Sequence, residues 1–353
     1  MRMETRDAIR SGEQAYSYHG EEYRDPRILV VGWGDAGCRM VTRLANLEVG
    51  GAETLALSTD RGMMERIRAD RKMLMERGFV EGDGAGADSE AGRVAAERSR
   101  RVLQNALRNR DLVFVVAGLD GGTGRGTGPG MRMGPETGAA PAICEMAREL
   151  GATVVGIFTL PQRASPGPGD VGRLGPAEIE ELASAASTLI LLDDDRVREM
   201  APGLSADQIF SVMDQVVAEI IRRMVETIIQ TSLINLDFAD VKTIMSDGGL
   251  SAALVGEFDL VDEAEKIVRS ALSSPMLEVE VKGAAGCLLH ITGGSDLTLK
   301  KAATIAAALT EELGPEANVI WGARVKEGHE GKIGLLAVMT GVGISPAACP
   351  REG

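Results

Sequence analysis

The chain has 353 residues, enough for about two domains of ordinary size. Hydrophobic residues make up 44% and charged residues 25%, as in ordinary globular proteins, although aromatic residues supply only 3%. The formal net charge of −14 argues against a nucleic-acid-binding surface, which usually needs a basic face. No apolar run reaches the roughly 18 residues needed to span a bilayer. We therefore expect a cytoplasmic protein that does not bind nucleic acid or insert into a membrane.

Cysteine and histidine usage excludes a zinc constellation. The four cysteines lie far apart without a Cys-x-x-Cys pair, and the chain has only three histidines. Free thiols in a reducing compartment are the interpretation that fits this spacing.

Apolar strands alternate with helices after a polar extension over residues 1–26. This alternation predicts an α/β domain over 27–204, Rossmann-like, with a mainly parallel sheet covered on both faces. The predicted strands are 27–34, 54–60, 111–118, 153–160 and 187–195, and the predicted helices are 36–50, 93–109 and 139–150.

A long helix is predicted over 205–230, with Ser205 as its N-cap. Two apolar stripes run along it, so it should be buried on more than one side and connect two domains. A second α+β domain is expected over 231–343, followed by a short tail over 344–353. Its predicted strands are 277–283, 286–292, 318–325 and 332–343, and its predicted helices are 264–272 and 299–313.

Three glycine-rich segments follow strands of the first domain. Gly32, Gly34 and Gly37 form a GxGxxG turn, and glycine-rich loops occur at 82–88 and 117–141. Because parallel strands end at one edge of a sheet, these loops should converge there. Their backbone N–H groups would suit a di- or triphosphate at a helix N-terminus. Ordinary strand-to-helix turns without a ligand are the alternative.

A P-loop lysine is absent, because the only Gly-Lys pair is followed by Ile333 rather than serine or threonine. The GxGxxG turn alone would also fit a Rossmann-type NAD(P) oxidoreductase, with Glu53 or Asp60 as the ribose acid. That interpretation leaves the other two glycine loops without a role.

The second and third glycine loops resemble a known family. VVAGLDGGTG together with TGAAP resembles the signature of the tubulin/FtsZ family. GDGAGADSEAGRVAAE, INLDFADVKTIM, SSPMLEVEVKGAAGCLLHITGGSDLTL and NVIWGARV resemble further segments of FtsZ-type members. The resemblance runs from about residue 27 to 343. It implies a cytoskeletal protein of cell division that binds and hydrolyses GTP, with GTP/GDP and Mg²⁺ as cofactors.

The resemblance assigns phosphate contacts to the three glycine loops. The first loop would run beside the α- and β-phosphates and the ribose, the second near the γ-phosphate, and the third around the β- and γ-phosphates. In that order the residues are Gly34, Asp35, Ala36, Gly37, Cys38 and Arg39; Ala85 and Gly86; and Gly121, Gly122, Thr123 and Gly124.

The resemblance also implies a base site on the long helix. Phe210 would stack on guanine, and the Asp214 carboxylate would accept hydrogen bonds from its two adjacent N–H donor groups. Adenine offers an acceptor at one of these positions, so a carboxylate selects guanine. From the residues alone, one core aromatic side chain and one solvated helix charge would be the favoured explanation of this pair.

Asn235, Asp237 and Asp240 form the catalytic candidates. By sequence alone, Asp237 is a helix N-cap. The resemblance implies that this loop lies far from its own nucleotide and reaches that of the next subunit in a head-to-tail filament. There Asp237 and Asp240 would orient the attacking water, while Asn235 fixes the loop. The principal partner would be the chain itself.

Several positions depart from the family pattern. Asp35 and Asp120 replace glycines, and Arg39 replaces an asparagine near the ribose and base. Asp170 and Arg173 are candidates to replace the usual ribose contacts. These changes motivate an alternative function: a structural filament or regulator that binds nucleotide with little hydrolysis.

The signature is split. GGTG at 121–124 and TGAAP at 137–141 are separated by an insertion over 125–136, although a loop over 122–128 is the alternative alignment. We expect the insertion to lie beside the phosphates, and a chain without it to remain a GTPase. Because the C-terminal tail is short, contact with membrane-tethering or division proteins at the division site would need another surface.

Overall fold

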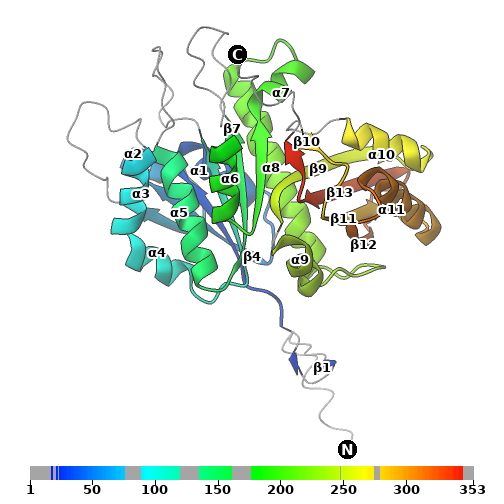
Figure 1. Ribbon diagram of the computed structural model, residues 1–353, viewed down its shortest axis with the longest axis horizontal. Coiled ribbons are helices and arrows are strands. Elements are labelled where there is room, and N and C mark those ends of the chain that lie inside the picture. The colour runs from blue at the N-terminus through cyan, green and yellow to red at the C-terminus, as the bar shows by residue number, and fades with distance from the viewer. Residues whose placement is uncertain are drawn as a thin grey trace, which may run out of the picture.

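A ten-stranded sheet forms the centre of the molecule (Figure 1). The computed structural model describes residues 17–18, 21–22, 24–75, 89–119, 135–160, 176–246, 248–273 and 279–344. The strand order is β12-β11-β13-β9-β8-β7-β6-β3-β4-β5. From β5 to β9 every neighbouring pair is parallel, whereas β13 runs antiparallel to both of its neighbours.

The elements follow the expected alternation. The strands are β1 (Ser17–Tyr18), β2 (Glu21–Glu22), β3 (Ile28–Trp33), β4 (Ala52–Ser58), β5 (Arg71–Leu74), β6 (Leu112–Gly118), β7 (Thr153–Leu160), β8 (Thr188–Asp193), β9 (Gly249–Asp259), β10 (Val279–Glu280), β11 (Gly286–Gly293), β12 (Asn318–Val325), β13 (Lys332–Thr340) and β14 (Gly343–Ile344). The helices are α1 (Gly34–Asn46), α2 (Arg61–Arg66), α3 (Ser89–Arg98), α4 (Arg100–Leu107), α5 (Pro135–Glu149), α6 (Pro176–Ala185), α7 (Asp194–Met200), α8 (Ala206–Ile229), α9 (Phe238–Met245), α10 (Ala264–Leu272) and α11 (Leu299–Leu313).

Both faces of the parallel part of the sheet are buried. In β3, Leu29 and Val31 pack with α3 to α6, while Ile28 and Val30 pack with α1 and α8. This double burial explains why the strands read as continuous apolar runs. It confirms the predicted Rossmann-like arrangement with a mainly parallel sheet.

The second half of the chain extends the same sheet. Strands β9, β11, β12 and β13 carry α10 and α11 on one face and the later turns of α8 on the other (Figure 1). Thr188 of β8 pairs with Gly249 of β9, so one sheet crosses from the first half to the second.

Helix α8 begins where its sequence predicts. The Ser205 side chain accepts a hydrogen bond from the Gln208 N–H, and the Gln208 side chain accepts one from the Ser205 N–H. This capping box satisfies two N–H groups at the helix start. The 24 residues of α8 span about 36 Å and contact both halves of the molecule, as the two apolar stripes predicted. Val212, a member of one of these apolar stripes, is an exception to their burial, because it is 37% exposed.

Some elements were not predicted. Strand β5 lies in a segment for which no strand was predicted, and β9 was missed because alanine and glycine interrupt its apolar pattern. The helix predicted at 93–109 is two helices that meet at Ser99. Within the described ranges, no helix is long and apolar enough to cross a membrane.

Candidate nucleotide site

The C-terminal ends of β3, β6, β7 and β8 lie at one edge of the sheet. Trp33 is level with Ala117, and Leu160 is level with Asp193 in the parallel register. The last described residue after β6, Leu119, donates its N–H to the carbonyl of Thr159 at 2.8 Å. The third glycine loop therefore starts from this edge, as expected from a parallel sheet.

The six predicted contacts in the second and third glycine loops lie outside the described residues and remain predictions. They are Ala85, Gly86, Gly121, Gly122, Thr123 and Gly124. The insertion at 125–136 falls outside the described ranges for all but its last two residues, and the ribose candidates Asp170 and Arg173 also fall outside them.

The turn between β3 and α1 depends on three glycines. A Cβ on Gly37 would lie 2.3 Å from the Val116 carbonyl oxygen, and a Cβ on Gly32 would lie 2.3 Å from the Gly37 carbonyl oxygen. Gly34 has φ of 70°, where a side chain would be strained. The helix thus starts against the sheet edge, and the side chain of Trp33 does not cap it. Its first N–H groups suit an anion.

Side chains from the first turn of α1 take two directions. Asp35 is partly exposed, whereas Ala36 and Cys38 are buried. The Cys38 thiol donates to the carbonyl of Leu57 at 3.3 Å, and burial raises its pKa to about 12. Among the predicted contacts, Ala36 and Cys38 have only backbone groups to offer a nucleotide.

Arg39 joins α1 to the predicted base site on α8. Its Nε lies 3.1 Å from Asp214 Oδ2, and its guanidinium carbon lies 5.5 Å from the centre of the Phe210 ring. Asp214 is buried at 7% exposure, while the Arg39 side chain is 45% exposed. We call these three residues the Arg39 contact. The structure therefore brings together residues that the resemblance assigned separately to the first loop and to the base.

The catalytic candidates lie beyond the other end of α8. The Asp240 N–H donates to Asp237 Oδ1 at 2.9 Å, and the Asp237 N–H donates to Asp240 Oδ2 at 3.0 Å. This capping box starts α9, as the sequence predicted for Asp237. Asn235 Oδ1 accepts the N–H of Ser232 at 2.6 Å and so shapes the loop before it.

The two groups of candidates are far apart within one chain. Fifteen residues of α8 separate Asp214 from the last residue of the helix, Ile229, a rise of roughly 22 Å. The loop with Asn235 is tied to β12 by a backbone bridge between Ile234 and Ala323. A nucleotide at the Arg39 contact is therefore out of reach of Asp237 and Asp240 of the same chain.

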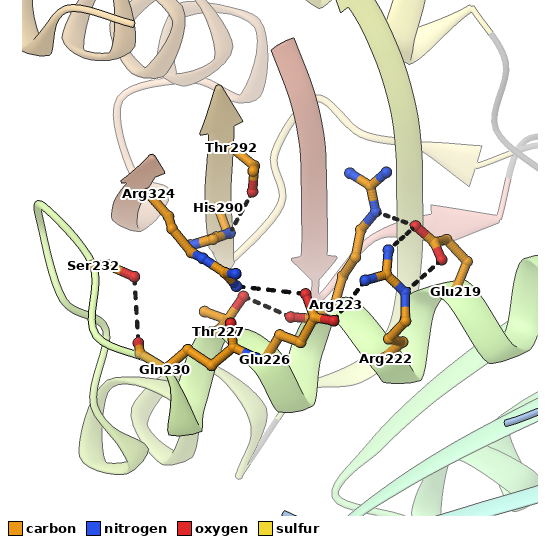
Figure 2. A network of polar contacts seen from close by, with 10 residues as sticks. All are labelled: Glu219, Arg222, Arg223, Glu226, Thr227, Gln230, Ser232, His290, Thr292 and Arg324. Atoms are coloured by element: carbon orange, nitrogen blue, oxygen red, sulfur yellow. Dashed lines mark hydrogen bonds and ion pairs between the residues drawn. The ribbon is translucent and has the colours of Figure 1, made fainter. Parts of the chain in front are cut away.

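A polar network covers the later turns of α8 (Figure 2). We call it the α8 network. Both Arg222 and Arg223 bond to Glu219 at 2.6 Å, and Arg222 also bonds to Glu226 at 2.6 Å. Its members are Glu219, Arg222, Arg223, Glu226, His290 and Arg324.

Two members of the α8 network have shifted pKa values. Burial alone would raise the pKa of Glu219, but hydrogen bonds from Arg222 and Arg223 outweigh it and hold the pKa at about 2. Burial, with the charges of Arg324 and Arg223, lowers the pKa of His290 to about 4. His290 is therefore neutral at physiological pH. This network was not predicted from the sequence, although the Glu-x-x-Arg-Arg-x-x-Glu spacing indicates bonds along a helix.

Comparisons with known proteins agree with this geometry. Residues 27–202 match the model of the GTPase domain of the tubulin/FtsZ family, and residues 249–343 match that of the FtsZ family C-terminal domain. The fold and these two family models identify a GTPase domain followed by a second domain. The chain belongs to the tubulin/FtsZ family. It is a GTP-binding and GTP-hydrolysing protein of the cell-division cytoskeleton, with Mg²⁺ as the metal that accompanies the nucleotide.

Three relatives illustrate the similarity. The chain is 41% identical over 343 residues to cell division protein FtsZ 2 of Haloferax volcanii, covering 96% of this chain and 81% of the relative. It is 42% identical to cell division protein FtsZ 2 of Methanocaldococcus jannaschii, covering 96% and 85%. A solved structure described as an empty FtsZ dimer of M. jannaschii superposes with a TM-score of 0.76 at 32% identity, covering 97% and 93%. These matches exclude the oxidoreductase interpretation.

Proposed function

We propose that guanine nucleotide binds between the start of α1 and the early turns of α8, and that the loop before α9 completes hydrolysis on the nucleotide of the next subunit. One observation supports this most directly: Asp214 lies in the first half of α8, whereas the Asp237–Asp240 capping box follows the last residue of that helix. Neither end of a single chain is a complete site. A head-to-tail contact between two chains would join them, and such contacts form open filaments.

The residues fit a guanine base. Phe210 is partly exposed and offers a ring for stacking, and the buried Asp214 carboxylate beside it has two oxygens that could accept the two N–H donors of guanine. A buried acceptor of this kind favours guanine, because adenine would leave the carboxylate facing an acceptor. Base selection thus comes from α8.

The start of α1 fits the phosphates. Gly34 and Gly37 let backbone N–H groups approach a ligand closely, and the helix dipole favours negative charge there. The predicted contacts of the second and third glycine loops would surround the rest of the triphosphate. Mg²⁺ supplies neutralisation of the phosphate charge when the nucleotide is bound.

The catalytic loop would present two carboxylates on one rigid turn. Because each carboxylate of Asp237 and Asp240 accepts a backbone N–H of the other residue, both are fixed at the start of α9. Phosphoryl transfer asks a protein mainly for positioning and electrostatic stabilisation, so two fixed carboxylates that orient a water are sufficient. Asn235 supports the loop from the preceding turn.

Self-association of this chain is consistent with the dimer of the M. jannaschii relative. We place the protein in the cytoplasm at the division site, where other division proteins would tether it to the membrane by protein contact. The alternative of a filament with little hydrolysis is decided by the experiment that follows.

The test is complementation between two inactive variants. Asp240→Asn keeps an acceptor for the Asp237 N–H but removes a catalytic charge, and Asp214→Ala removes the base acceptor. Each alone should release phosphate from GTP and Mg²⁺ at about a hundredth of the wild-type rate or less. A mixture of the two should recover activity, because Asp240→Asn still binds nucleotide and Asp214→Ala still supplies an intact catalytic loop. Light scattering reports assembly.

Two results would contradict the proposal. Co-assembly of the mixture without any recovered phosphate release would show that the sites are not shared between subunits. Assembly of wild-type protein with the same negligible release as Asp240→Asn would favour the filament that hydrolyses little. Asp207→Asn, which alters an exposed residue in the first turn of α8, is the matched control and should behave as wild type.

A further inference from the structure

The side chain in contact with the predicted base-binding residues is itself a guanine analogue in its chemistry. The guanidinium of Arg39 is a planar group of N–H donors around one carbon, and guanine contains the same N–C–N donor fragment. In the described structure, Arg39 donates to Asp214 and lies over Phe210. These are the two interactions expected of a guanine base: a carboxylate acceptor and an aromatic face.

Arg39 cannot keep its contacts with Asp214 and Phe210 when a base binds to the same two residues. Asp214 is 93% buried, as its 7% exposure shows, and its Oδ2 is already within 3.1 Å of Arg39 Nε. A base stacked on the same face of Phe210 would occupy the space of the guanidinium. The Arg39 side chain is 45% exposed, so it has a path to solvent.

We propose that Arg39 occupies the base position in the nucleotide-free chain and that guanine nucleotide binds by displacing it. The inference rests on the base site of the proposed function and adds a regulatory element to it: an internal competitor that lowers affinity and takes back Asp214 when nucleotide leaves. The exchange replaces one set of N–H donors on Asp214 with another, so the buried carboxylate keeps donors in both states.

Arg43 provides a matched control one helical turn along α1. Its Nε donates to the Gln215 side chain at 2.7 Å, so it too links α1 to α8. It carries the same charge, but its acceptor on α8 is a neutral amide. An effect of positive charge or of the α1–α8 link would appear in both variants, whereas competition for the base position would appear only at Arg39.

The experiment measures binding of guanosine, the nucleoside without phosphates, by calorimetry on the full chain. Arg39→Gln should bind guanosine about three- to tenfold more tightly than wild type, as expected when an ion pair and a cation–π contact no longer compete. Arg43→Gln should match wild type. Arg39→Lys keeps the charge without the planar donor array and should fall between wild type and Arg39→Gln. Tripolyphosphate should bind Arg39→Gln no more tightly than wild type.

The outcomes separate the two proposals. Guanosine binding to Arg39→Gln that equals or falls below wild type, with guanosine binding abolished in Asp214→Ala, would overturn the competitor and leave the base site intact. Guanosine binding that is unaffected by Asp214→Ala would instead overturn the base site itself. Circular dichroism of each variant establishes that the fold is retained before binding is measured.

Discussion

Arg39 and Arg222 both pair with carboxylates of α8, yet they stand in different surroundings. Arg39 makes an ion pair with the single carboxylate of Asp214 and is 45% exposed. Arg222 bonds to Glu219 and Glu226, is 18% exposed, and its hydrogen bonds with Glu219 raise its pKa. An exposed pair contributes little to stability and breaks easily, while a network of partly buried charges resists change. The first half of α8, which carries Asp214, is thus suited to exchange of partners, and its later turns are suited to holding the two halves together.

The largest effect on stability should follow from placing a side chain where α1 approaches the sheet most closely. Gly37→Ala places a Cβ 2.3 Å from a backbone oxygen, which cannot move aside like a side chain, so the unfolding free energy should fall by about 3 kcal/mol or more. Gly50→Ala is the control, because no atom lies within 4 Å of its Cβ position. Urea unfolding of both variants measures the difference. Equal stability would show that α1 can shift, and that the nucleotide end is not rigid.

The next effect concerns His290 of the α8 network. Its pKa is about 4 in the folded chain and about 6.5 when unfolded, so the unfolded state binds more protons between these values. The contribution of neutral His290 to the free energy of unfolding is fully present above pH 6.5 and is lost as pH falls toward 4. Between pH 7 and 5 the loss amounts to about 2 kcal/mol. Because glutamine does not titrate, the unfolding free energy of His290→Gln should fall by about 2 kcal/mol less than that of wild type between pH 7 and 5. Identical pH dependence in the two proteins would exclude a buried neutral histidine.

A smaller effect is expected for Glu219 at lower pH. Its folded pKa of about 2 lies below the ordinary value of 4.5, so its stabilisation is present above pH 4.5 and disappears as pH falls toward 2. Because the group is partly solvated, we expect about 1–2 kcal/mol. In urea unfolding, Glu219→Gln should weaken the dependence of stability on pH between pH 4.5 and 3. Glu199→Gln, which alters a 62% exposed side chain, should leave that dependence unchanged. A similar flattening in both variants would contradict the network.

The smallest effect should be found at the Arg39 contact. Arg39→Gln should lower the stability of the nucleotide-free chain by about 0.5–1 kcal/mol, since it removes a half-exposed ion pair and a cation–π contact. With saturating GTP the difference from wild type should vanish, because the contact is already broken in the bound form. Thermal unfolding with and without nucleotide measures this. A loss that persists at saturation would mean that Arg39 stays on Asp214 when nucleotide is bound.

Sequence reasoning succeeded where the determinants are local. Ser205 and Asp237 were predicted as N-caps because residues of these types directly precede helical segments, and each forms a capping box with the residue three positions on. The parallel sheet followed from the apolar strands and the helices between them. The catalytic loop and the base site were assigned by resemblance, and the structure shows that the later turns of α8 separate them.

It failed where the partners are distant in the chain. Glu226 and Arg324 are 98 residues apart, and Arg39 and Asp214 are 175 residues apart, so no spacing rule indicates either pair. The inward direction of Cys38 depends on how α1 lies on β3 and β4. Strand β9 contains too few large apolar residues to be recognised, although β13 pairs along most of its length.

The junction between β8 and β9 has a mechanical consequence. Three residue pairs form this ladder, whereas β9 and β13 share nine. A pull that separates the halves of the molecule would meet few hydrogen bonds here, and the load would pass to the apolar packing of α8. The resistance of the molecule to such a pull therefore depends more on the side chains packed around α8 than on the strand ladder that joins its two halves.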